Sequence, residues 1–145
     1  MANLVPYAFP VELLSGTHNF ASNTFKLALY ATSTYTTAST VYVTASETSG
    51  TEYSAGGNTL TGNAVSNVAN YATVDFTDSV WGSPTPATFS AAFGAIYNTS
   101  ATSKLIVVLD FGGTKSCSNG TFTVTFPSPT SGAPSGSDAL LSIQS

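Results

Sequence analysis

The only histidine in this sequence, His18, is the first residue that could take part in chemistry. A catalytic histidine needs a nucleophile or a carboxylate beside it, and a zinc site needs at least two further nitrogen or sulfur ligands. The chain offers Cys117 and several carboxylates, but none stands at metal-ligand spacing from His18. This pattern favours a structural histidine, in a turn or on the surface, over a catalytic or zinc-binding one.

Three aspartates suggest a second kind of site. Asp75 and Asp78 could join Asp110 around a calcium ion, because calcium prefers hard oxygen ligands. However, the sequence contains no Asp-x-Asp-x-Asp-Gly loop, and an aspartate that follows a strand is a common turn former. We therefore expect no bound metal.

Glu47 and Glu52 could form the carboxylate pair of a glycoside hydrolase. They lie in a small polar stretch, residues 46–53, which is typical of a loop with solvated carboxylates. A polysaccharide-cleaving groove would also need several aromatic platforms, and Trp81 is the only tryptophan. Trp81 fits a core or interface anchor better than a sugar platform. We expect a protein that is not an enzyme and binds no cofactor, with a polysaccharide depolymerase as the weakest alternative.

The chain carries very little charge: three lysines, no arginine and seven carboxylates among 145 residues, for a net charge of −4. Soluble domains usually carry about a quarter of their residues as charged side chains. A charged fraction of 7% leaves a surface of Thr, Ser, Asn, Gly and apolar groups. Such a surface has no basic patch for nucleic acid and suits permanent contact with other protein. We expect no nucleic-acid partner.

The sequence also predicts no contact with membranes. A spanning helix needs roughly 18 uninterrupted apolar residues, and the longest clean run here is Leu105–Leu109. The N-terminus lacks the basic and apolar regions of an export signal. Cys117 is the single cysteine and cannot form an internal disulfide, which indicates folding in a reducing compartment.

One short helix and a series of strands must position these residues. The helix is expected over Pro10–Leu14, because proline suits a first helical turn and Gly16 suits the position past its end. Residues 24–32 then alternate with period two, which predicts a strand with one core-facing side. That side carries Phe25, Leu27 and Leu29.

Further strands are expected at short spacing. Residues 104–111 are almost wholly apolar, which predicts a central strand covered on both faces. Asn119-Gly120 predicts a hairpin turn before a strand over residues 121–126. The other candidates are residues 40–44, 59–66, 71–76 (with Ala72, Val74 and Phe76 on one face), 89–97 and 139–143. The fold class is all-β: a single domain over residues 1–145, built as a β-sandwich or jelly-roll-like barrel of seven to eight antiparallel strands.

Two segments and several aromatic residues are candidate contact surfaces. The prolines of residues 1–10 favour an extended N-terminal arm, and residues 127–137, rich in Pro, Gly and Ser, form a long contact loop. Tyrosines supply contact area with a polar tip, although the edge of the core would suit them equally. The candidate interface residues are Val5, Pro6, Tyr7, Phe9, Tyr35, Tyr42, Tyr53, Trp81, Pro127, Pro129 and Pro134.

Short motifs spread over nearly the whole chain carry a likeness to known proteins. They comprise Glu47, Gly50, Tyr53 and residues 1–4, 13–16, 19–20, 23–30, 55–57, 60–62, 74–76, 80–81, 95–98, 108–112 and 119–124. As a set they resemble small structural proteins of tailed-bacteriophage virions. This resemblance implies a place in the virion and brings no catalytic residues. The insertion at residues 127–137 departs from the pattern of the group.

The expected function is that of a capsid cement or decoration protein. It would be made in the cytoplasm of the bacterial host, join the virion, bind the major capsid protein and stabilise the shell. Copies of the chain would also contact one another as a dimer or trimer. The alternative is a tail or tail-fibre protein that binds glycans of the host surface through Trp81 and the polar loops.

Overall fold

The computed structural model describes residues 3–68, 71–127 and 141–144. Its elements are α1 (Ala8–Leu14), β1 (Phe25–Tyr30), β2 (Asn58–Thr59), β3 (Ala64–Val68), β4 (Tyr71–Asp75), β5 (Ser79–Trp81), β6 (Ala87–Asn98), the short 3-10 helix η1 (Thr99–Ala101), β7 (Lys104–Gly120), β8 (Phe122–Val124) and β9 (Leu141–Gln144). The protein is therefore all-β with one short N-terminal α-helix, as predicted. Within the described residues, no helix is long and apolar enough to span a membrane.

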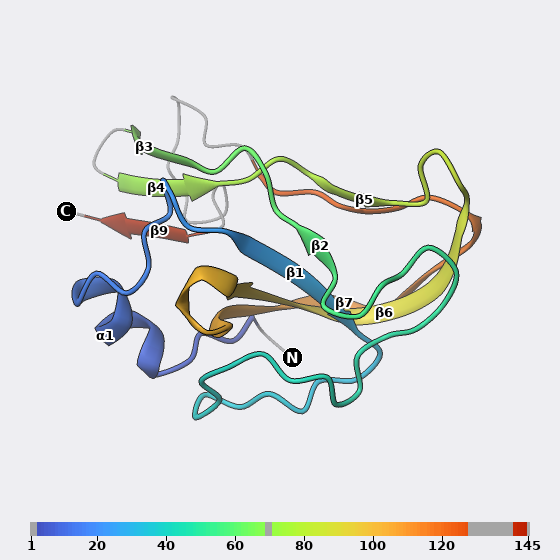
Figure 1. Ribbon diagram of the computed structural model, residues 1–145, viewed down its shortest axis with the longest axis horizontal. Helices are drawn as coiled ribbons and strands as arrows, with labels where there is room; N and C mark the ends of the chain where they lie inside the picture. The colour runs from blue at the N-terminus through green and yellow to red at the C-terminus, as the bar shows by residue number, and fades with distance from the viewer. Residues whose placement is uncertain (1–2, 69–70, 128–140, 145) are drawn as a thin grey trace.

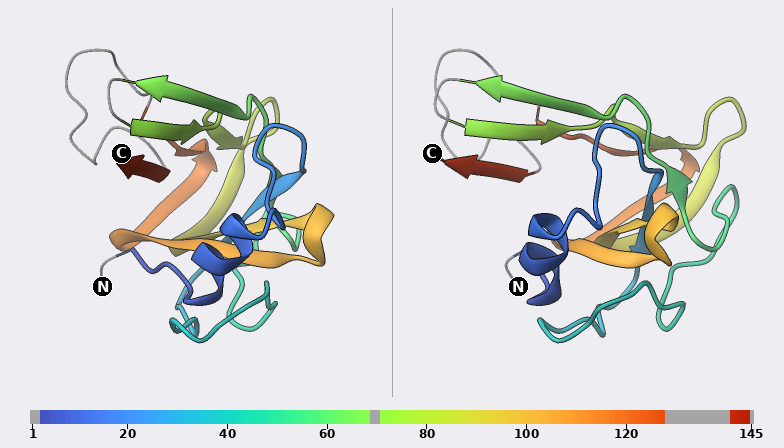
Figure 2. Two further views of the ribbon diagram at one scale, coloured as in Figure 1. Left: turned by 90° about the vertical axis from the view of Figure 1, so that its left-hand side faces the viewer. Right: turned by 60° about the vertical axis from the view of Figure 1, so that its left-hand side comes forward.

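The strands form three antiparallel sheets with the orders β2-β1-β6-β7, β3-β4-β9 and β5-β8. The long strands β6 and β7 curve from the first sheet toward the β5-β8 sheet (Figures 1 and 2). One apolar cluster joins all three sheets through Phe25 of β1, Val74 of β4 and Phe122 of β8. This cluster is the main core of the protein.

β1 is buried on both faces rather than one. Phe25, Leu27 and Leu29 point into the main core, as the alternation predicts. The opposite face carries Ala28 and Tyr30, which belong to a second buried cluster. The sequence did not indicate this second cluster, because its cover comes from residues far away in the chain, such as Tyr97 of β6.

The predicted central strand, residues 104–111, is wrong in its position. β6 lies inside the four-stranded sheet and β7 lies at its edge. Residues 105–108 are nevertheless buried, because isolated bridges from Leu4 to Val108 and from Val41 to Lys104 cover that edge. An apolar run in the sequence indicates that a strand is buried, but it does not indicate the position of the strand in the sheet. β7 is also longer than predicted, since it continues nine residues past Phe111 to Gly120.

The hairpin predicted at Asn119-Gly120 is also wrong. Asn119 has a left-handed backbone with φ of 49°, so the chain bends there. β8, however, pairs with β5 and not with β7. The Asn-Gly signal correctly marks a change of chain direction. Which sheet β8 joins is decided by where Phe122 and Val124 become buried.

Two other predicted strands fail. Residues 40–44 form only the single bridge at Val41, and no named strand covers residues 31–57. Residues 59–66 divide into the end of β2 and the start of β3, because Gly62 turns the chain between them with φ of +67°. β-branched residues favour a strand only where a neighbouring strand pairs with them.

The remaining elements match in type and differ at their ends. The helix starts two residues earlier than predicted, at Ala8. The strands over residues 71–76 and 89–97 are confirmed as β4 and β6. Of the face predicted for β4, Val74 and Phe76 are buried but Ala72 is exposed. The final strand is β9, and residues 139–140 of its predicted span lie outside the described residues.

Candidate functional site

The N-terminal segment packs on the domain instead of extending away from it. The backbone N–H and carbonyl groups of Leu4 and Val108 exchange two hydrogen bonds of 2.8 Å. Pro6 and Phe9 are buried. The described part of the predicted arm is thus a short docked segment followed by a helix, because Leu4, Pro6 and Phe9 find cover on the domain.

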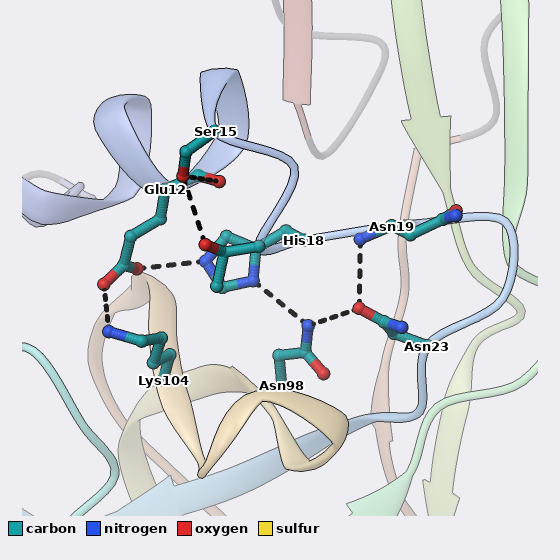
Figure 3. Close-up of polar contacts among 8 residues, drawn as sticks. Glu12, Ser15, His18, Asn19, Asn23, Asn98 and Lys104 are labelled. Atoms are coloured by element: carbon teal, nitrogen blue, oxygen red, sulfur yellow. Dashed lines mark hydrogen bonds and ion pairs between the residues drawn. The ribbon is translucent and has the colours of Figure 1, made fainter.

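A chain of polar side chains anchors this segment to the strands (Figure 3). His18 Nε2 lies 3.0 Å from Glu12 Oε2, and Lys104 donates to the other Glu12 oxygen. On the other side of the ring, Asn98 Nδ2 lies 3.1 Å from His18 Nδ1 and donates to Asn23 Oδ1 at 2.8 Å. We call these five residues, Glu12, His18, Asn23, Asn98 and Lys104, the N-terminal polar cluster.

The contacts of Asn98 fix where the proton of His18 sits. Asn98 Oδ1 accepts a hydrogen bond from the backbone N–H of Ser100, so its amide nitrogen faces the ring. His18 Nδ1 must then accept, and Nε2 carries the proton that it donates to Glu12. The side chain of His18 is fully buried, so the histidine is structural but not on the surface, which corrects one part of the prediction.

The cluster also leaves His18 no free ring nitrogen. Glu12 and Asn98 occupy both nitrogens. The nearest hydroxyls along the chain, Ser15 and Thr17, bond to each other at 3.1 Å. Among the described residues, no group of three or more His, Cys, Asp or Glu side chains could hold a metal ion. The arrangement joins α1 to the strands through both ring nitrogens of His18.

Glu12 is the charged centre of the cluster. Burial raises the pKa of its carboxyl, but hydrogen bonds from Lys104 and His18 outweigh burial and hold the pKa below the ordinary value of 4.5. Glu12 therefore keeps an ionised carboxylate, because the Lys104 ammonium and the N–H of His18 both contact it. Lys104 keeps about a third of its side chain in solvent, which makes this pair a partly buried one.

A second polar network surrounds Glu47. The hydroxyl of Tyr42 donates to one carboxylate oxygen at 2.5 Å, and the hydroxyl of Tyr53 donates to the other at 2.6 Å. The backbone N–H of Gly56 adds a third hydrogen bond of 2.6 Å. The Tyr53 hydroxyl also accepts from the backbone N–H of Leu29 in β1. Glu47 thus joins an irregular segment to a strand through neutral donors only.

Three more tyrosines extend this network. Tyr30 and Tyr35 share a hydroxyl contact of 2.8 Å, and Tyr30 also donates to the carbonyl of Val43. Tyr97 donates to the carbonyl of Gly56, and its ring stacks on Tyr42 with centroids 4.4 Å apart. We call the set of Glu47 with Tyr30, Tyr35, Tyr42, Tyr53 and Tyr97 the tyrosine network. It holds residues 31–57 in place where no strand does.

The tyrosine hydroxyls stay protonated to unusually high pH. Burial is the main cause, and the nearby negative charge of Glu47 adds to it. Together they raise the pKa of Tyr97 to about 12. The pKa values of Tyr42 and Tyr53 are raised further, since both hydroxyls donate directly to Glu47.

Glu47 and Glu52 do not form a hydrolytic pair. Both oxygens of Glu47 are already bonded to donors of its own chain. Glu52 is exposed and adopts a left-handed backbone with φ of 62°. Trp81 is 3% exposed and packs against Tyr53, Phe89 and Phe122, so it is a core residue and not a sugar platform.

The three aspartates considered for calcium are not brought together either. Asp75 caps the N–H of Phe76, and Asp78 accepts a 2.9 Å hydrogen bond from the N–H of Phe126. These two residues line one shallow hollow beside Gly62. Asp110 lines a different hollow of about 670 Å³ beside β8. Asp75 thus makes a local backbone contact, and Asp78 makes a long-range one to the chain that follows β8.

The candidate interface residues divide by exposure. Val5, Tyr7 and Pro127 are exposed, and Tyr42 and Tyr53 are half-buried. Pro6, Phe9, Tyr35 and Trp81 are buried. Pro129, Pro134 and most of the predicted contact loop at residues 127–137 lie outside the described residues. Three of the four tyrosines predicted for an interface, Tyr35, Tyr42 and Tyr53, therefore form contacts inside the protein.

Two exposed residues were missed by the sequence analysis. Val11 is 68% exposed and Leu14 is 89% exposed, both on α1. With Tyr7 they stand at the spacing i, i+4, i+7, which places them on one side of a helix. That spacing was visible in the sequence, but it does not tell which side of a helix faces out.

Comparisons of this chain with protein-family models, curated proteins and solved structures find no match. We therefore infer function from the residues themselves. The polar cluster and the tyrosine network bind parts of the chain to each other, and both use charged side chains to do so.

Proposed function

We propose that this chain is a non-enzymatic structural protein of a bacteriophage virion. Its role is that of a capsid cement or decoration protein, which binds the major capsid protein and stabilises the shell. One observation carries the proposal: most of the few charged residues in the described part of the chain are partly buried. The exposed surface is more neutral than the composition alone implies, which suits lasting contact with protein.

The burial of the charged residues supports this. Among those in the described part of the chain, only Glu52, Asp78 and Lys115 are exposed. The other six are partly buried, namely Glu12, Lys26, Glu47, Asp75, Lys104 and Asp110. Two of them, Glu12 and Lys104, neutralise each other. A surface of this kind carries little long-range field to steer ions or nucleic acid.

The proposal includes the architecture. Three antiparallel sheets enclose one main core, and the long strands β6 and β7 belong to the largest of them. We assign this arrangement to a β-sandwich with jelly-roll-like features, a form whose rigid faces present loops at their ends. A rigid body that binds through area rather than chemistry fits the role of a cement protein.

The contact would work by buried area and repetition. A standard interface covers about 1,600 Å² in total and combines apolar anchors with a polar rim. Hydroxyl-bearing residues such as Thr121, Thr123 and Thr125 are exposed and could supply such a rim. The partners are the major capsid protein and further copies of the chain, as a dimer or trimer, and the virion assembles in the host cytoplasm.

Electron microscopy of particles tests the proposal directly. Particles made without this protein and particles with it restored should differ by density repeated over the whole shell. Density confined to the tail would support the tail or fibre alternative instead. That alternative relied on Trp81 and the polar loops as the glycan-binding surface, and of these Trp81 is buried. A purified protein that releases reducing sugar from polysaccharide would contradict the non-enzymatic role.

A further inference from the structure

The outward side of α1 is apolar, which reverses the usual arrangement of a surface helix. Tyr7 already has helical backbone angles, so Tyr7, Pro10, Val11 and Leu14 fall within an arc of about 100° at roughly 3.6 residues per turn. Tyr7 is 75% exposed, and Pro10 is exposed as well. We call these four residues the outer stripe of α1.

The inward side of the helix fixes this orientation. Phe9 is buried in the main core and Leu13 packs against it. Glu12, the only charged residue of α1, also points inward, where it contacts His18 and Lys104 (Figure 3). Turning the helix would expose Phe9 and break the polar cluster. The outer stripe is therefore held rigidly in solvent.

The size of the stripe argues against a second copy as its occupant. The exposed side chains present roughly 400 Å² of apolar surface, which is the size of the largest patch on a typical monomer and is often functional. Two stripes packed on each other would bury about 800 Å², below the ~1,200 Å² at which stable specific interfaces begin. A groove on a partner protein that encloses the helix would bury more surface of α1 than a second copy of the stripe would.

Charge argues against a membrane. Interfacial helices carry Lys or Arg along their polar face to contact anionic lipid. α1 contains no basic residue, and the lysine that contacts it, Lys104, is paired with Glu12. Anchors at i, i+4 and i+7 are instead the spacing by which helices dock into grooves of other proteins.

We propose that the outer stripe of α1 docks into an uncharged apolar groove on a partner protein. This inference rests on the proposed function, in which that partner is the major capsid protein. Tyr7, Val11 and Leu14 are the anchors. The N-terminal polar cluster holds α1 in the orientation that exposes these anchors. Because the helix is fixed before it docks, binding costs little conformational entropy.

The test measures co-sedimentation of the purified protein with capsids prepared from particles that lack it. Val11→Asp and Leu14→Asp place a charge in the groove, and each should weaken capsid binding by at least about tenfold. Leu14→Gln, which favours helix, repeats the test with a neutral side chain. The matched control is Val65→Asp, since Val65 is 56% exposed on β3 and lies outside the stripe. Its binding should stay within about twofold of the unchanged protein.

The outcomes separate the two proposals. Capsid binding by the unchanged protein, kept in all three stripe variants, would overturn the stripe as the contact and leave the proposed function standing. No binding of the unchanged protein to capsids would overturn the proposed function. Self-association lost in Leu14→Asp would assign the stripe to a second copy, and flotation with phosphatidylcholine vesicles lost in the same variant would assign it to a membrane. Either result would contradict the groove.

Discussion

The N-terminal polar cluster and the tyrosine network each bury a carboxylate, and they satisfy it in opposite ways. Glu12 contacts a lysine and a histidine, so its charge is compensated. Glu47 contacts two tyrosine hydroxyls and a backbone N–H, all of them neutral. Both solutions avoid an unpaired buried charge, which would cost several kcal/mol. The difference lies in the groups whose pKa is shifted: the pKa of Glu12 is lowered, and the pKa values of the tyrosines near Glu47 are raised.

The two regions also hold different kinds of chain. The polar cluster secures a helix, which already satisfies most of its own backbone groups. The tyrosine network secures residues 31–57, which contain only isolated bridges. β2 pairs with only Lys26 and Leu27 of β1, so the Tyr53 hydroxyl satisfies the N–H of Leu29 where a strand would otherwise do so. We therefore expect the tyrosine network to contribute more to stability.

Gly57 gives the largest expected effect. Its φ is +68°, and an added Cβ would overlap the carbonyl of Leu27 in β1. Gly57→Ala should lower the free energy of unfolding by about 3–5 kcal/mol, because the whole segment must move off the strand. Gly16 is the matched control near the polar cluster, since it has φ of +76° and open space around it. Gly16→Ala should cost about 1 kcal/mol, the left-handed backbone alone. If both variants lost the same free energy of unfolding in urea, the contact between Gly57 and the Leu27 carbonyl would not be tight.

Removal of Glu47 comes next. Glu47→Ala leaves the hydroxyls of Tyr42 and Tyr53 and the N–H of Gly56 without their acceptor, at an expected cost of about 3 kcal/mol. Exposed Glu52, five residues further on, is the control, and Glu52→Ala should change stability by less than about 0.5 kcal/mol. Similar values for both variants would mean that the network is solvated.

Removal of Glu12 should cost less. Glu12→Ala leaves His18 and Lys104 unpaired, but Lys104 is partly exposed and can turn to water. We expect a loss of about 2 kcal/mol. A double-mutant cycle with Lys104→Met measures the coupling energy between Glu12 and Lys104. This coupling energy should be well below the stability lost in Glu12→Ala, because that variant also removes the contact of Glu12 with His18. A loss larger than that of Glu47→Ala would reverse the order of the two regions.

Alkaline pH should weaken the tyrosine network. The pKa values of its tyrosines are raised in the folded state, chiefly by burial, whereas an unfolded tyrosine has a pKa of 10.0. The unfolded chain then releases protons first, so stability is complete below about pH 10 and declines as pH rises toward the folded values. For Tyr97 that value is about 12. Urea unfolding across this range should show a smaller decline in Tyr42→Phe. An unchanged slope would contradict the role of Tyr42.

Acid should produce the opposite and smaller effect at the polar cluster. The pKa of Glu12 in the folded state lies below its ordinary value of 4.5, so the unfolded chain takes up the proton first. The stabilisation is present above that value and is lost as pH falls through the folded pKa. Glu12→Gln should flatten the decline of thermal stability below about pH 4.5. A flat profile in the unchanged protein would contradict the ion pair.

Several elements could be predicted from the sequence because local rules were sufficient. Pro10 and Gly16 marked the helix, and period-two alternation marked β1 and the buried residues of β8. The order of the strands could not be predicted in this way. Residues 104–111 read as a central strand because they are almost wholly apolar, yet they lie at the edge of the sheet, which is covered by Leu4 and Val41 from distant parts of the chain. Local sequence does not encode such long-range pairings.

The two polar regions were harder still to predict. The sequence singled out His18 and Glu47 for chemistry and set both aside, but it gave no sign that Asn98 or Tyr97 would meet them. Side chains with hydroxyl and amide groups do not recur at a regular spacing in the sequence as buried apolar residues do. Each of them is positioned by an individual hydrogen bond. The same limit applied to the outer stripe of α1. Only the contacts of Phe9 and Glu12 reveal which side of the helix is open.

The sequence by itself determined that this protein is all-β, carries very little charge, and begins with one short helix. These properties follow from composition and from the spacing of apolar residues, which act locally. The tertiary structure decided where the few charges went, which aromatic residues were core, and which apolar residues remained in solvent. The reason is physical: burial of a polar group is tolerated only where partners converge on it, and those partners come from segments that meet only in the folded chain.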